Sequence, residues 1–158
     1  MNAAPPRLYR SSGRRGFLNE LVGDPRHIHA RKLVRQVQVL FTDTACTVQT
    51  PEGAVQARPG DAIVTGIAGE RWRVSRSHFS DKYRPAATTH AGEAGAYLSL
   101  PNRILALRMS EPFDVLLADG ASRLHGRPGD WLVDYGDGSL GVVSNAIFDV
   151  TYEVVEDA

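Results

Sequence analysis

The stretch RPGDAIVTGIAGERWRVSRSHFSDKYRP, residues 58–85, returns 69 positions later as RPGDWLVDYGDGSLGVVSNAIFDVTYEV, residues 127–154. The two segments align without a gap, and ten of their 28 positions are identical. Identity covers an Arg-Pro-Gly-Asp turn and then six single positions: two valines, a glycine, a serine, a phenylalanine and a tyrosine. The chain therefore contains an internal repeat, and this repeat organises the rest of the sequence.

The repeat extends upstream of the Arg-Pro-Gly-Asp turn. An offset of 67 aligns Val48 with Val115, and two extra residues near Leu124 account for the change of offset. The resulting division is a basic N-terminal arm with a short helix over 1–32, a first unit over 33–87, a linker over 88–99 and a second unit over 100–158.

Each copy has the pattern of short β-strands. Val37, Val39 and Phe41 fall on one face of an extended segment, which is strand periodicity. Proline fixes φ and glycine tolerates positive φ, so the Pro-Gly-Asp segments predict tight turns between strands. Strands are expected at 36–41, 46–50, 54–57, 62–65 and 71–74, then at 104–109, 113–117, 131–135, 140–143 and 150–155.

Both copies end alike. Ser75 and Ser144 are placed to cap a helical turn. A phenylalanine follows four residues after each serine, and a tyrosine four residues after that. We expect a capped turn that drives the phenylalanine into the core, followed by a final strand.

These patterns predict a mainly β protein. Two tandem units of roughly 50 residues would pack as a pseudo-symmetric pair, either as one closed barrel or as two small barrels that share a face. A joint core over 33–158 is favoured, because five short strands bury little apolar surface alone. The short helix is expected at 16–22, where Phe17, Leu18, Leu21 and Val22 share one face.

Composition excludes several classes of protein. The chain has 158 residues, 42% of them hydrophobic, and a net charge of zero, so it is neither disordered nor uniformly basic. No apolar run is long enough to span a bilayer, and a cytoplasmic location is expected. The single cysteine, Cys46, excludes an internal disulfide and is expected to be a buried structural thiol.

Charge is nevertheless uneven along the chain. Residues 1–35 hold eight basic and two acidic residues, a net charge of +6. Such an arm could bind phosphates or an acidic partner, but packing on the protein's own acidic body or on a second copy is favoured. The first ten residues are expected to be frayed. A homo-oligomer is plausible, because open β units expose edges.

The Pro-Gly-Asp turns resemble a known family. Residues 127–136, Arg-Pro-Gly-Asp-Trp-Leu-Val-Asp-Tyr-Gly, are similar to the signature of the bacterial PGDYG family, although four residues separate Pro-Gly-Asp from Tyr-Gly. The first copy also resembles small phage and prophage proteins with a pattern like PGDWIITGVKGE and a later PDIF. The resemblance implies a recurrent β unit and carries across no activity and no catalytic residue.

The two copies differ in chemistry along the strands expected at 71–74 and 140–143. Residues 70–73 read Glu-Arg-Trp-Arg, whereas the aligned residues 139–142 read Ser-Leu-Gly-Val. Arg71 and Arg73 would share one strand face, and paired guanidiniums suit carboxylate or phosphate recognition. The alternative is a solvated face with cross-strand ion pairs. The candidate ligand-binding residues are Glu70, Arg71, Arg73, Lys82 and Arg84 of the first copy, with Asp134 and Tyr135 of the second.

Other chemistry has weaker support. His27 and His29 would share a strand face and could bind one metal ion, but no carboxylate follows at the spacing a cupin requires, so no metal and no cofactor is predicted. Asp61 and Asp130 could be paired acids, although hydrogen bonding to turn backbone is favoured.

Three functions remain open. The favoured one is a non-enzymatic β module that binds a partner protein or a small anionic ligand. The second is a small hydrolase or lyase-like enzyme that uses Glu70 or Asp61 as a base in a cleft between the repeats. The third is nucleic-acid binding through the basic arm, residues 7–35.

Overall fold

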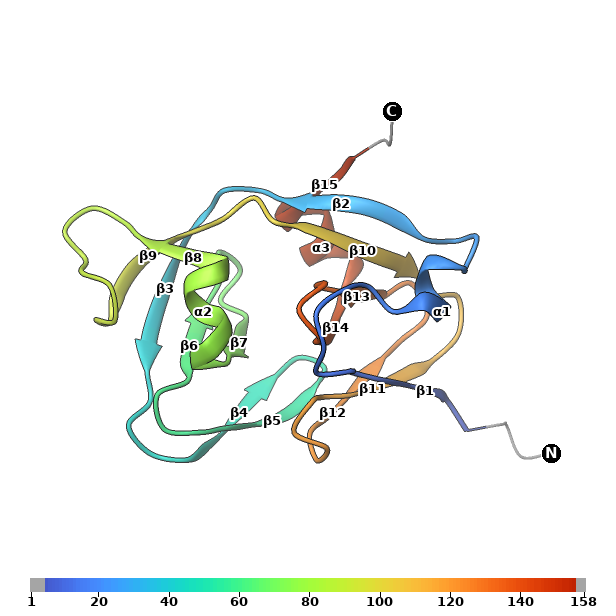
Figure 1. Ribbon diagram of the computed structural model, residues 1–158, viewed down its shortest axis with the longest axis horizontal. Helices are drawn as coiled ribbons and strands as arrows, with labels where there is room; N and C mark the ends of the chain where they lie inside the picture. Colours follow the sequence, from blue (N-terminus) through green and yellow to red (C-terminus); the bar gives the residue numbers. More distant parts are fainter. Residues whose placement is uncertain (1–4, 156–158) are drawn as a thin grey trace. The chain divides into compact units, whose positions relative to one another are not determined.

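A computed structural model describes residues 5–155. Within them, strands predominate and three short helices interrupt them, so the mainly β prediction is confirmed (Figure 1). No helix in this described part is long and apolar enough to cross a membrane. The helices are α1 (Asn19–Val22), α2 (Arg76–Lys82) and α3 (Asn145–Thr151). The strands are β1 (Arg7–Arg10), β2 (Ile28–Lys32), β3 (Gln36–Phe41), β4 (Cys46–Thr50), β5 (Gly53–Ala57), β6 (Ala62–Thr65), β7 (Arg71–Val74), β8 (Tyr83–Pro85), β9 (Gly95–Ser99), β10 (Arg103–Arg108), β11 (Phe113–Leu116), β12 (Arg123–Gly126), β13 (Trp131–Asp134), β14 (Leu140–Val143) and β15 (Tyr152–Val155).

The chain forms two compact units. One runs from Arg31 to Asn102, and the other combines the described residues up to Ala30 with those from Arg103 onward. Four sheets make up these units, and over residues 5–155 none of the four closes into a barrel. The barrel expected from the sequence is therefore not found, and the chain passes between the units twice.

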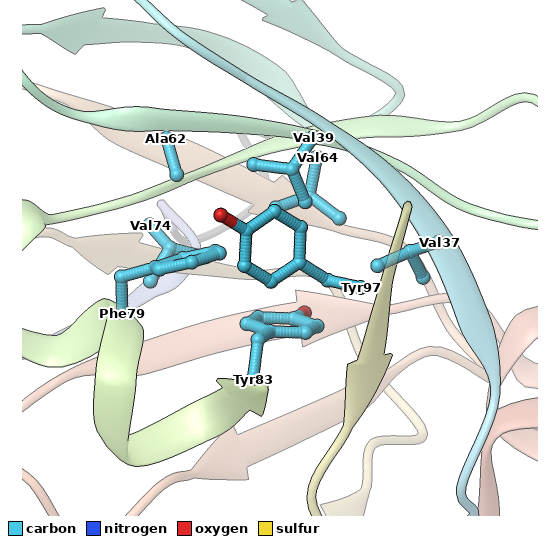
Figure 2. Close-up of a cluster of buried hydrophobic side chains, with 8 residues drawn as sticks. All are labelled: Val37, Val39, Ala62, Val64, Val74, Phe79, Tyr83 and Tyr97. Carbon is cyan, nitrogen blue, oxygen red and sulfur yellow. The ribbon is translucent and has the colours of Figure 1, made fainter. Parts of the chain in front are cut away.

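The unit of residues 31–102 is built on a five-stranded sheet, β7-β6-β3-β9-β8. Strand β3 lies at its centre and pairs antiparallel with β6 and β9. The alternation in β3 buries Val37 and Val39 as predicted. Figure 2 shows the aromatic residues Phe79, Tyr83 and Tyr97 converging on these valines from α2, β8 and β9.

The other unit has a five-stranded sheet with the order β14-β13-β10-β2-β15. Its core includes Ile104, Val133 and Phe148, and Trp131 stacks on Phe148 with ring centroids 4.1 Å apart. Two further sheets are smaller: β1-β11-β12 in this unit, and the β4-β5 hairpin in the unit of residues 31–102.

The two five-stranded sheets have corresponding registers. Ala62 pairs with Val74 between β6 and β7, and Trp131 pairs with Val143 between β13 and β14, which is the same pairing displaced by the repeat. The strand on the other side of the central strand comes from a different part of the chain in each sheet. In the first sheet this strand is β9, beside β3, and it follows β8 along the chain. In the second sheet it is β2, beside β10, and it precedes β3 along the chain.

Several local predictions were wrong. The segment 88–99, expected to be a linker, contains β9. The first ten residues, expected to be frayed, contain β1, which pairs parallel with β11 and buries Tyr9. Residues 1–4 and 156–158 of the expected arm and second unit lie outside the described residues. The sequence missed β1 and β9 because β1 pairs with β11 and β9 pairs with β3, and pairing with a strand far away in sequence leaves no local signal.

The helical segments lie where the sequence predicted them, but their bounds and their caps differ from the prediction. The first is shorter than expected, Asn19–Val22, and Val22 is exposed while Leu21 is buried. Ser144 accepts a hydrogen bond from the Ile147 N–H at 3.3 Å and so caps α3 as predicted. Ser75 does not cap α2, because its hydroxyl bonds the side chains of Ser77 and His78 instead.

The two Pro-Gly-Asp turns each contain the same type of hydrogen bond. The carboxylate of Asp61 accepts from the Arg58 N–H, and that of Asp130 accepts from the Arg127 N–H, both at 2.9 Å. This is the turn-stabilising role expected of a short acidic side chain. Asp61 does more, because it also accepts from the Arg76 N–H and lies 3.6 Å from the Arg73 guanidinium.

This asymmetry predicts unequal effects of one substitution. Asp61→Ala should lower the free energy of unfolding by about 3 kcal/mol, because it leaves the largely buried Arg73 guanidinium without its counter-charge. Asp130→Ala removes one turn hydrogen bond and should cost about 1 kcal/mol. Urea unfolding of the two variants measures the difference, and equal losses would contradict the role assigned to the ion pair.

Candidate functional site

The residue that stands out chemically is Lys32, at the end of β2. Its ammonium donates a hydrogen bond to the Tyr83 hydroxyl, with Nζ and Oη 2.9 Å apart. The same Nζ lies 4.7 Å from the centroid of the Tyr83 ring and 5.6 Å from that of Trp72. Trp72 Nε1 also donates to Tyr83 Oη, at 3.2 Å. One amine and two aromatic residues thus form a connected cluster, which we call the Lys32 site.

Local structure explains how these side chains meet. Helix α2 ends at Lys82, so Tyr83 begins β8, and its ring stacks on that of Phe79 with 5.2 Å between the ring centroids. On β7, Trp72 shares the inner face with buried Val74 and packs against the same core. Tyr83 is almost fully buried, and its hydroxyl lies within hydrogen-bond distance of the Lys32 ammonium.

The repeat shows that the Lys32 site exists in one copy only. Tyr83 is retained as Tyr152, but Trp72 is replaced by Gly141, and the offset of 67 sets Lys32 against Ser99. The aromatic volume is supplied differently in each unit. A Cβ added at Gly66 would overlap the Glu70 carboxylate and would also meet the Trp72 ring, at 2.9 Å.

In the other unit the arrangement is reversed. There Tyr135 stands where the first copy has Gly66, and a Cβ added at Gly141 would meet the Tyr135 hydroxyl at 2.8 Å. A glycine and an aromatic residue have exchanged positions across the hairpin between the copies. In the first copy this arrangement places the indole N–H of Trp72 beside Tyr83, the tyrosine that the repeat retains as Tyr152.

Burial changes the acid–base properties of the pair. Lys32 is half-buried, and desolvation of its ammonium lowers its pKa from 10.5 to about 8. Desolvation raises the pKa of Tyr83 to about 12, against the smaller opposing effects of the Trp72 hydrogen bond and the Lys82 charge. At neutral pH the pair is therefore a cationic amine beside a protonated phenol.

A count of hydrogen bonds shows what this pair can still bind. An ammonium has three N–H donors, and the structure uses one of them, toward Tyr83. Tyr83 Oη accepts from Lys32 and Trp72, which leaves its own O–H to donate. Among residues 5–155, no carboxylate forms an ion pair with Lys32 and no acceptor takes the Tyr83 O–H. The site is thus rich in donors and positively charged.

Some of the site residues predicted from the sequence are not members of the Lys32 site. Arg71 is exposed, whereas Arg73 pairs with Asp61 and donates to the Gln56 carbonyl at 3.2 Å. Both point away from the strand face that carries Trp72, as alternation requires. Glu70 is on the Trp72 side, where its carboxylate accepts from the Ala68 N–H at 3.1 Å and stabilises the turn.

The remaining predicted residues are divided between the units. Lys82 is half-buried at the end of α2, and Arg84 is exposed on β8. Asp134 belongs to the other unit and is 1% exposed, so it lines no surface there. Its burial raises its pKa, while hydrogen bonds from the backbone N–H groups of Leu18 and Gly136 act in the opposite direction. Tyr135 follows it and packs over Gly141.

Within the described residues, no three or more His, Cys, Asp or Glu side chains are grouped so that they could hold a metal ion. His27 and His29 contact each other edge to face, 5.5 Å between ring centroids, and the Nδ1 of His27 lies 2.7 Å from the Asp24 carbonyl. Cys46 is half-buried rather than fully buried and packs against the small core of β4 and β5. Exposed His125 hydrogen-bonds the buried carboxylate of Asp114 at 2.7 Å, a pair that sequence reasoning missed.

Ion pairs occupy part of the basic arm. Arg7 pairs with Glu20 at 3.1 Å, and Arg26 pairs with Asp24 at 2.8 Å. The Arg26 hydrogen bond is the main reason that the pKa of Asp24 falls to about 2. Lys32, counted in the sequence only as one charge of this arm, is instead a member of the site. The signals that could have found it are the loss of Trp72 in the second copy and the presence of only two lysines among 18 basic residues.

Comparison with known proteins adds one relationship. The model of a protein family described as "PGDYG protein" matches residues 53–153, which is more than half of the chain. Neither a curated protein nor a solved structure gives a significant match.

Proposed function

The chain belongs to the PGDYG protein family, and from that premise we propose that it is a non-enzymatic β module that binds a small anionic ligand at the Lys32 site. The observation that carries the proposal is the half-buried Lys32 ammonium, which has a phenol as its hydrogen-bond partner and no counter-ion among the described residues. A desolvated cation is costly, and a bound carboxylate or phosphate would supply the missing charge.

The donors also suit the shape of an oxyanion. The two remaining N–H groups of Lys32 and the O–H of Tyr83 start from atoms 2.9 Å apart, so they can converge on one carboxylate or phosphate group. Trp72 and Tyr83 offer apolar ring surface for the body of the ligand.

We propose further that the two five-stranded sheets descend from one duplicated unit and that only one copy kept the binding site. Support comes from the ten shared residues and from the equivalent pairs Ala62–Val74 and Trp131–Val143. Duplication explains why one scaffold can lose the site without losing its packing: Tyr135 over Gly141 replaces Trp72 over Gly66.

Anion titration tests the proposal. Inorganic phosphate and acetate should each quench or shift the fluorescence of Trp72, measured in a Trp131→Phe background so that Trp72 is the only tryptophan. Lys32→Met should weaken binding at least tenfold, whereas Lys82→Met and Arg71→Ala should leave it unchanged. Affinity should fall as the pH rises through about 8, because Lys32 then loses its charge.

Two outcomes would decide against the proposal. Equal anion affinity in the parent protein and in Lys32→Met would place any binding elsewhere. Loss of binding in Arg71→Ala but not in Lys32→Met would favour the exposed face of β7, where an acidic partner protein is the more natural ligand.

A further inference from the structure

We infer that Lys32 is a nucleophilic amine that condenses with the carbonyl group of a small α-oxo acid to form an imine, with Tyr83 as the proton-transfer partner. This inference rests on the proposed anion site, because it assigns a class of ligand to the same residues. Three observations carry it: the half-buried amine, the hydroxyl at 2.9 Å, and the Tyr83 and Trp72 rings within about 6 Å of the amine nitrogen.

The amine meets the requirements of a nucleophile. A lysine attacks a carbonyl only in its neutral form, and an apolar environment without a counter-ion favours that form. Within the described residues, Lys32 contacts the Tyr83 hydroxyl and two aromatic faces. Lys82 lies near enough to Tyr83 to affect its titration, whereas the lowered pKa of Lys32 comes from desolvation.

Tyr83 is placed to move the protons. The Nζ lone pair forms a bond to the carbonyl carbon while the carbonyl oxygen takes the phenol proton, which gives a carbinolamine. An N–H proton returns to Tyr83 Oη, Tyr83 passes it to the carbinolamine oxygen, and this oxygen leaves as water while the nitrogen lone pair forms the C=N bond of a protonated imine. The Tyr83 phenolate left by the first transfer takes up the proton that the Lys32 ammonium released when it became neutral. The balance is one amine and one carbonyl compound to one imine and one water, with no oxidant or reductant. Because the Tyr83 pKa is raised to about 12, the phenol holds its proton at the start of this sequence.

Charge selects an α-oxo acid over a neutral aldehyde. In the encounter complex, the carboxylate would receive hydrogen bonds from the Lys32 ammonium, and the Tyr83 O–H would remain for the carbonyl oxygen that it protonates. After condensation, a protonated imine keeps one positive charge next to that carboxylate. A neutral aldehyde would leave the desolvated cation without a counter-charge at both stages.

The test is reductive trapping with pyruvate. The full-length protein is incubated at pH 8 with pyruvate and cyanoborohydride, and the modified residue is located by peptide mass mapping. The chain has only two lysines, so Lys82 is an internal control, with the terminal amine as the other reference. We expect one reduced pyruvate unit on Lys32, none in Lys32→Met, and unchanged modification in Lys82→Met. Tyr83→Phe should slow the modification by roughly 100-fold, as loss of a general acid does.

Lactate separates this inference from the proposed function, because it carries the same carboxylate but cannot form an imine. Modification of Lys32 that lactate blocks supports both. Modification of Lys32 that lactate leaves unchanged supports the nucleophile and overturns the anion site. Lactate binding at Lys32 without modification, or with equal modification of Lys82, overturns the nucleophile and leaves the anion site standing. Parent and variants are compared by circular dichroism so that a folding defect in Tyr83→Phe is recognised. At saturating pyruvate, where the weaker anion binding at high pH does not limit the reaction, the rate of imine formation in the parent should rise with pH to a plateau above about 8.

Discussion

Lys32→Met should be more stable than the parent protein at pH 7, by up to about 3 kcal/mol. The pKa of Lys32 falls from 10.5 to about 8 on folding, and each pKa unit corresponds to about 1.4 kcal/mol. Below pH 8 both the folded and the unfolded chain hold the proton, so the folded state bears the full cost of the desolvated charge. Methionine has a similar length and no charge, so it removes this cost.

The difference in stability between Lys32→Met and the parent should also depend on pH. Between pH 8 and 10.5 the unfolded chain binds more protons at Lys32 than the folded chain does, so stability rises with pH in that window. The gap between Lys32→Met and the parent should therefore shrink as the pH rises. Tyr83 acts in the opposite sense above pH 10, because its pKa is raised from 10.0 to about 12 and stability is lost as the unfolded chain ionises first.

Urea unfolding from pH 6 to 9.5 measures this effect below the range where Tyr83 titrates. Lys82→Met is the matched control, since it removes the other lysine at the end of α2. A constant gap between Lys32→Met and the parent over this range would contradict the assignment of the lowered pKa to Lys32. A variant that gains stability and loses anion binding would show that this lysine is kept for its chemistry rather than for the fold.

Gly126→Ala should destabilise the protein by about 3 kcal/mol. Gly126 lies on β12 directly opposite Phe113 on β11, and an added Cβ would overlap the Phe113 ring. That ring is 1% exposed and packs edge-on against Tyr9, so it has little room to move. The cost comes from side-chain overlap, since Gly126 does not have a positive φ.

A matched glycine isolates the overlap. Gly23→Ala should change the free energy of unfolding by less than about 1 kcal/mol, because Gly23 has φ of −77° and a Cβ there would meet only the Asn19 carbonyl, at 3.3 Å. The double variant Gly126→Ala with Phe113→Leu should recover part of the loss, since leucine is smaller. Urea unfolding that places Gly126→Ala within 1 kcal/mol of the parent would show that Phe113 can move after all.

Local sequence predicted the elements that local physics governs. Strands β4, β6, β7 and β14 have the bounds expected from alternation and from Pro-Gly turns. The buried positions of Phe79 and Phe148, four residues after their serines, follow from helical spacing. Val150 was expected on the last strand but lies exposed on α3, because the helix continues to Thr151.

Reasoning from local sequence predicted the candidate site residues only in part. The difference between the copies at residues 70–73 pointed to the correct strand, β7, but to its arginines rather than to Trp72. Arg73 turned out to balance the charge of Asp61, an interaction between β7 and a turn that spacing alone does not reveal. A residue's charge is visible in the sequence, whereas its counter-ion is not.

The amino-acid sequence by itself determined the β class, the repeat, the turn chemistry of the Pro-Gly-Asp segments and the aromatic residue that closes each copy. These features depend on dihedral preference and on the periodicity of apolar side chains, which act over a few residues. Only the tertiary structure decided that β2 takes the place beside β10, and that Lys32 meets a tyrosine 51 residues away. Pairing between distant segments is selected by the burial of whole strand faces, and so is the desolvation that gives Lys32 its altered pKa.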